Sequence, residues 1–160
     1  MDVIGKKPRS EAGQHYWNNC SGWRPLASYC CDVAPEITGA CKYWQSNDGD
    51  GLDDAGAAAL AKILKARIAD GTVAKHALMQ SSAIELLANV PCSSCNGGKE
   101  FACVGEEDLA RLRAWTPDMG CGWCNNTGYC RPAAAGYGLS VESVAKFADF
   151  LADCGGFEIW

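Results

Sequence analysis

The chain has 160 residues, of which 48% are hydrophobic and 21% are charged, and its formal net charge is −5. This composition is typical of a globular protein and excludes intrinsic disorder as its main state. The most apolar run, residues 55–64, is rich in alanine and contains Lys62, so no membrane span is expected. Basic residues are scattered, which disfavours a protein that wraps duplex nucleic acid.

The first half of the chain is expected to be helical after a tail. Residues 1–14 are polar and basic and predict a flexible tail, and residues 15–90 predict the helical part of the core. Pro25 and Pro35 each suit a first helical turn, which predicts short helices over 25–33 and 35–45. An acidic loop follows and leads into predicted helices over 53–70 and 72–89, separated by Gly71.

The second half changes character at Pro91. Residues 91–135 predict a zinc-knuckle lobe with one short helix at 106–115, and residues 136–160 complete the core. Ser140 suits a helix N-cap and precedes an apolar stripe, and residues 157–160 alternate like a short strand. The predicted fold class is α+β, mainly helical, as a single compact domain with an inserted zinc-knuckle lobe.

Eleven cysteines are the outstanding feature of the composition. The N-terminal residues lack the apolar stretch and cleavage site of a secretory signal peptide, so a cytoplasmic protein with reduced thiols is expected. An odd number of cysteines also argues against a closed disulfide framework. The cysteines are therefore expected to be metal ligands or ordinary buried thiols.

Four of the cysteines form two Cys-x-x-Cys pairs, Cys92 with Cys95 and Cys121 with Cys124. Two thiolates separated by two residues can bind one ion from a tight turn, and Asn or Gly after the second cysteine tolerates the positive φ that this turn needs. Two such turns supply the four sulfurs of a closed, structural zinc site, with one Zn²⁺ per chain. Free buried thiols and a rubredoxin-like iron are the alternatives.

The sequence around these pairs resembles the cysteine-rich zinc repeats of DnaJ-type chaperones, Cys-x-x-Cys-x-Gly-x-Gly. Gly97 and Gly128 match glycines of that repeat, whereas Lys99 and Asn126 stand where the others should be. The resemblance implies a zinc-binding turn. It does not imply chaperone activity, because the His-Pro-Asp signature of a J-domain is missing from the sequence.

Most of the chain also resembles a family of small, functionally uncharacterised proteins of bacteriophages and bacteria. The resemblance is carried by residues 44–52, the two cysteine pairs, and the stretch from residue 140 to residue 160. It implies a phage or prophage accessory protein and supplies no functional residues.

Three further features are candidate sites. Asn47, Asp48 and Asp50 form an acidic loop, but the EF-hand register puts Ala57 where calcium requires a glutamate, so a helix-capping turn or a ligand loop is expected. Outside the four ligands, Cys103 and Cys130 are candidates for a second shell or for alternate ligands. Trp123 lies between two predicted ligands and is the best candidate for contacting a partner.

The favoured function is a zinc-stabilised, non-enzymatic binding protein that contacts a host or phage protein, such as a defence factor. A small-ligand or nucleotide binder or enzyme that uses the Asp48–Asp54 loop is the first alternative. A nucleic-acid-binding zinc protein is the second, with a local basic set formed by Lys99, Arg111, Arg113 and Arg131. No catalytic constellation is recognised in the sequence.

Overall fold

The computed structural model describes residues 1–95 and 121–160. The predicted helix over 106–115 therefore lies outside the described residues. The chain divides into two compact units, which we call the main unit (Met1–Glu85 with Gly136–Trp160) and the cysteine unit (Leu86–Ala135). The fold is α+β and mainly helical, as the sequence predicts, and the cysteine unit is inserted between two parts of the main unit.

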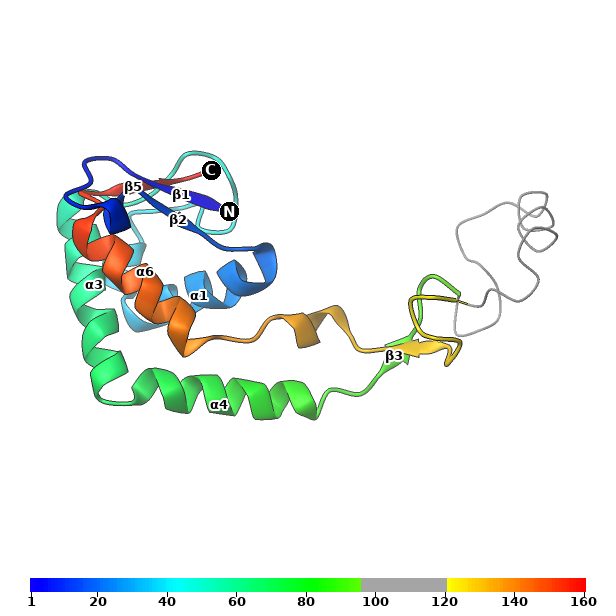
Figure 1. The fold of residues 1–160 in the computed structure, drawn as a ribbon. Coiled ribbons are helices and arrows are strands. Elements are labelled where there is room, and N and C mark those ends of the chain that lie inside the picture. The colour runs from blue at the N-terminus through cyan, green and yellow to red at the C-terminus, as the bar shows by residue number, and fades with distance from the viewer. Residues whose placement is uncertain (96–120) are drawn as a thin grey trace. The chain divides into compact units, whose positions relative to one another are not determined.

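A three-stranded antiparallel sheet joins the two ends of the chain in the main unit (Figure 1). Strand β1 (Asp2–Gly5) lies between β2 (His15–Trp17) and β5 (Phe157–Ile159), so that Val3 faces Tyr16 on one side and Ile159 on the other. The prediction of a flexible tail over residues 1–14 is therefore wrong. The tail is held because β1 has a partner on both edges, and η1 (Glu11–Gly13) links it to β2.

Helix α1 (Cys20–Val33) begins five residues before the predicted start at Pro25. Its N-cap is Asn19, whose side chain accepts a hydrogen bond from the Gly22 N–H at 2.8 Å. Pro25 thus lies inside the helix rather than at its first position. Helix α2 (Pro35–Thr38) begins as predicted but ends after one turn, where the Thr38 hydroxyl bonds back to the Ala34 carbonyl.

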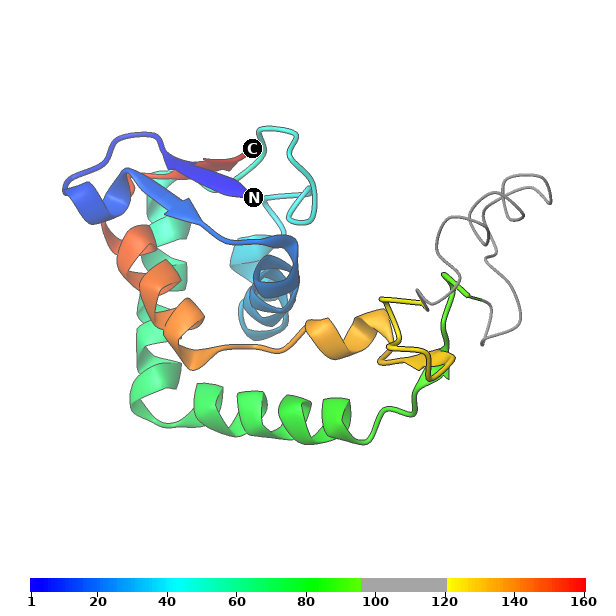
Figure 2. The same ribbon diagram turned by 45° about the vertical axis from the view of Figure 1, so that its right-hand side comes forward.

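The three long helices predicted from caps and apolar stripes are present. Helix α3 (Asp54–Ala69) is capped by Asp53, and α6 (Val141–Asp153) is capped by Ser140. Gly71, at φ +79°, separates α3 from α4 (Thr72–Glu85), which ends four residues earlier than predicted. Figure 2 shows α6 lying alongside α3 within the main unit.

Aromatic side chains fill the core between the sheet and these helices. Trp23 of α1 stacks on Trp44, and Phe147 of α6 meets Trp23 edge-on. The indole N–H of Trp23 donates to the Trp44 carbonyl at 2.6 Å, and that of Trp44 donates to the Thr38 carbonyl at 3.0 Å. These two bonds satisfy the polar atoms of two buried indoles and hold the segment after α2 against α1.

The cysteine unit contains a short antiparallel hairpin of β3 (Val90–Pro91) and β4 (Tyr129–Cys130). A single turn, η3 (Ala133–Gly136), follows β4 along the chain. Across the described ranges of both units, every helix is too short or too polar to cross a membrane.

Candidate metal centre

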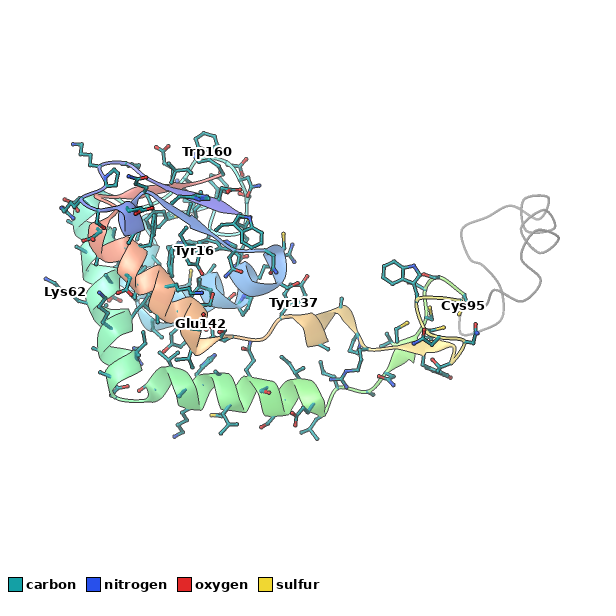
Figure 3. The ribbon with its side chains drawn as sticks, in the orientation of Figure 1. Tyr16, Lys62, Cys95, Tyr137, Glu142 and Trp160 are labelled. Carbon is teal, nitrogen blue, oxygen red and sulfur yellow. The ribbon has the colours of Figure 1, made fainter. Side chains whose placement is uncertain are left out.

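The four cysteines of the two Cys-x-x-Cys pairs come together in the cysteine unit; Cys95 is labelled in Figure 3. Their sulfur atoms all lie within 4.8 Å of one another. The Sγ atoms of Cys92 and Cys121 are 3.7 Å apart, and those of Cys95 and Cys124 are 3.6 Å apart. All four side chains are buried, and together they form the core of this unit.

Two of these distances match those around one tetrahedral metal ion. Zinc–sulfur bonds of about 2.3 Å arranged as a tetrahedron place neighbouring sulfurs about 3.8 Å apart. The Cys92–Cys121 and Cys95–Cys124 sulfur distances are within about 0.2 Å of this value. The arrangement also brings one cysteine from each pair into contact with one from the other, which two unrelated buried thiol pairs would not require.

The local backbone explains why the second turn can present two sulfurs. Asn125 and Asn126 have φ values of 49° and 66°, in the region that the sequence assigned to them. The Asn126 N–H donates to the Cys121 carbonyl at 3.3 Å, and the Thr127 N–H donates to the Cys124 carbonyl at 3.0 Å. Gly97, the corresponding position after the first pair, lies outside the described residues.

The β3–β4 hairpin brings the two turns together although they are far apart in sequence. Val90 faces Cys130, Pro91 faces Tyr129, and the Cys92 N–H donates to the Gly128 carbonyl at 2.8 Å. Strand β3 thus leads directly into Cys92, and the turn that contains Cys121 and Cys124 leads directly into strand β4.

Hydrogen bonds in the turns stabilise thiolates, the form that binds metal. Burial acts to raise the pKa of Cys92, but the N–H groups of Cys95 and Ser94 and the neighbouring thiols of Cys130 and Cys121 lower it to about 6. For Cys124, burial is likewise outweighed, chiefly by the Gly128 N–H, and the pKa is lowered. The site is therefore prepared to hold a cation.

The remaining candidates near the centre have different positions. Cys130 packs against the four-cysteine cluster, whereas Cys103 lies outside the described residues. Trp123 is 82% exposed, between Cys121 and Cys124, and its carbonyl accepts a hydrogen bond from the Cys130 thiol at 3.7 Å. Of the local basic set, only Arg131 is described, and its guanidinium donates to the Leu87 carbonyl at 3.1 Å.

The acidic loop lies in the main unit, and its polar groups are used internally. Asp50 accepts hydrogen bonds from the N–H groups of Lys42, Tyr43 and Gly51 at 2.6, 3.2 and 2.8 Å. Asp48 accepts from the Ser46 hydroxyl, and Asn47 is exposed. Asp50 thus has a structural role as the organiser of a turn, which the sequence did not identify.

Three other cysteines, Cys30, Cys41 and Cys154, are buried in the core of the main unit. Burial raises the pKa of all three thiols, to about 12 for Cys41. They are therefore neutral, apolar core residues at physiological pH.

A polar network that the sequence did not predict links β2 to the start of α6; Tyr16 and Glu142 are labelled in Figure 3. The Asn18 amide donates to the hydroxyl oxygens of Tyr16 at 3.1 Å and Ser143 at 2.9 Å. Burial raises the pKa of Tyr16, so its hydroxyl stays protonated at neutral pH and cannot deprotonate Ser143. Lys146 cannot do so either, because its ammonium group forms an ion pair with Glu142. The network joins strand β2 to the start of helix α6. No local sequence signal could reveal it, since its partners are more than 120 residues apart.

Comparisons of the chain with models of protein families, with curated proteins and with solved structures give no match.

Proposed function

We propose that the protein is a zinc-stabilised, non-enzymatic binding protein whose cysteine unit carries the contact surface for a partner protein. The observation that carries this proposal is the buried cluster of four sulfurs, two of whose distances match a tetrahedral zinc site. Cys92, Cys95, Cys121 and Cys124 would hold the ion. Four protein ligands leave no position for a water molecule or a substrate, which favours a structural ion over a catalytic one.

The surface of the cysteine unit supports the contact role. Trp123 is largely exposed on a turn that has a ligand at each end, and Tyr129 and Val90 of the neighbouring hairpin are also exposed. Exposed tryptophan and tyrosine are the residues that most often dominate binding energy at protein interfaces. A metal-tied turn would hold Trp123 in place before binding, which lowers the entropy lost on association.

The class of partner follows from charge and from the sequence resemblance. The chain has a net charge of −5, which favours a protein partner over nucleic acid. A phage or prophage origin, which rests on the resemblance alone, would make that partner a host macromolecule such as a defence factor.

The proposal is tested in two steps with the full chain. Protein purified without added metal should contain one zinc per chain by elemental analysis. Immobilised zinc-loaded protein should then capture a partner that Trp123→Ala does not capture. Trp17→Ala is the matched control, because Trp17 is an exposed tryptophan (61%) of the main unit. Metal-free, fully folded protein, or equal capture by the wild type and Trp123→Ala, would contradict the proposal.

A further inference from the structure

A fifth thiol lies at the proposed metal centre. Cys130 packs against the buried cluster formed by Cys92, Cys95, Cys121 and Cys124. A tetrahedral ion takes only four sulfurs, so one thiol of the five is in excess. This excess thiol is half-buried and belongs to the same unit as the four ligands.

The hairpin fixes which ligand Cys130 approaches. Val90 of β3 faces Cys130 of β4, and Cys92 follows Val90 by two residues. Residues two apart in an extended chain point to the same face, so Cys92 and Cys130 are diagonal neighbours on one side of the hairpin. The side chains of these two cysteines are in hydrogen-bonding contact.

A second contact of Cys130 is weak. Its thiol donates to the Trp123 carbonyl at 3.7 Å, a weak bond that is replaceable by water at this half-buried position. A rotation about the Cα–Cβ bond can carry a cysteine sulfur between staggered positions without moving the backbone.

We propose that Cys130 is an alternate metal ligand that exchanges with Cys92, an inference that rests on the proposed metal site. In the exchange, Cys130 loses its thiol proton to solvent and bonds to the ion, while the Cys92 sulfur leaves the ion and takes up a proton. Four thiolates bind the metal before and after, so charge and coordination number are conserved. The centre thus has two four-sulfur states that share Cys95, Cys121 and Cys124.

The first test compares single and double variants in their metal content and their cobalt spectra. Cys92→Ser should keep one metal per chain and the sulfur-to-cobalt charge-transfer absorbance of four thiolates. Cys92→Ser combined with Cys130→Ser should lose this absorbance and bind metal far more weakly. Cys124→Ser, which removes a ligand of the other pair while keeping Cys130, is the control and should show the absorbance of fewer thiolates.

The second test uses the zinc-loaded wild-type protein, so that it does not depend on how a ligand variant folds. Brief treatment with iodoacetamide, followed by mass spectrometry, should label Cys92 as well as Cys130 while the other three ligands stay protected. In Cys130→Ser, Cys92 should be protected like the others. Cys31→Ser, which removes a half-buried thiol of the main unit, should label as the wild type does.

The outcomes separate this inference from the proposed function. If the wild type binds zinc but Cys92→Ser is metal-free and Cys92 is fully protected in the wild type, Cys130 is only an outer hydrogen-bond donor and the exchange is wrong. Removal of such a donor should weaken metal affinity by about 10–100-fold without changing the cobalt spectrum. If the wild type binds no metal, the metal site and the exchange fail together.

Discussion

Asp50 is a loop carboxylate that accepts hydrogen bonds from the backbone. The N–H groups of Lys42, Tyr43 and Gly51 donate to it and so connect the segment after α2 to the loop before α3. Sequence patterns read this loop as a candidate ligand site because aspartates and glycines alternate there. A pattern of residue types does not distinguish a carboxylate that awaits a ligand from one that is saturated by its own backbone.

Replacing Asp50 should therefore destabilise the main unit. Asp50→Ala removes three charge-assisted acceptor contacts and should lower the free energy of unfolding by about 1–3 kcal/mol. Urea denaturation measures this change. Asp48→Ala, in the same loop but exposed, is the control and should stay within about 0.5 kcal/mol of the wild type. Equal effects of the two variants would contradict the structural role of Asp50.

The same contacts predict a dependence on pH. Burial acts to raise the pKa of Asp50, but the hydrogen bonds from Gly51, Lys42 and Tyr43 outweigh it, so the folded pKa lies below the ordinary value. Asp50 thus stabilises the fold above the unfolded pKa of about 3.9, and this stabilisation is lost as the pH falls through the folded value. Between pH 6 and pH 3, the wild type should lose more stability than Asp50→Asn does, as measured by urea titration at each pH.

The lowered pKa of Cys92 predicts how metal binding depends on pH. Because its pKa is about 6, it is already a thiolate at neutral pH in the metal-free protein and releases no proton when metal binds. Below that pH, a proton must leave, and metal affinity should fall more steeply. Titration calorimetry in buffers of different ionisation enthalpy should show about one more proton released per metal at pH 5 than at pH 7 from this group. An unchanged proton count would contradict the lowered pKa.

At the scale of secondary structure, elements with strong local signals were predicted and elements that depend on distant partners were not. Helices α3 and α6 have caps and apolar stripes within the segment itself; α3 was placed within one residue at each end, and α6 begins after its predicted N-cap Ser140. Strand β1 has four residues and is held by β2 and by β5, the latter about 150 residues away. Such a pairing leaves no local trace in the sequence.

The start of α1 illustrates a conflict between two local signals. Pro25 is typical of a first helical turn, which predicted the helix start there. Asn19 is an equally good N-cap, and in the structure it is the residue that begins the helix. The four-cysteine cluster was predictable for the opposite reason, because the Cys-x-x-Cys spacing within each pair is itself a local signal.

Close backbone approach between elements predicts which glycines are indispensable. A Cβ at Gly51 would lie 2.0 Å from the Phe157 carbonyl oxygen of β5, whereas one at Gly138 would meet Ile84 at an ordinary 3.8 Å. Gly51→Ala should therefore destabilise the main unit by about 1–3 kcal/mol, since backbone must move to relieve the clash. Gly138→Ala should change stability by less than about 1 kcal/mol. Thermal denaturation compares the two, and similar melting temperatures would contradict the packing of this loop against β5.

For the whole molecule, the two units should respond differently to metal removal. In the described residues of the cysteine unit the core is the four-cysteine cluster, whereas the main unit has its own aromatic and aliphatic core. A chelator should therefore unfold the cysteine unit and leave the main unit folded. Hydrogen exchange should speed up in residues 86–95 and 121–135 and stay unchanged in α6. Loss of protection in both units at once would contradict independent cores.

The central sheet has a consequence for how the protein is made. Asp2 and Trp160 exchange backbone hydrogen bonds of 2.7 Å in both directions, which places a strand from the first residues beside one from the last. On the ribosome, β1 can pair with β2 early, but its second edge stays open until residues 157–159 have emerged. Chains that lack residues 157–159 should therefore expose a bare strand edge on β1.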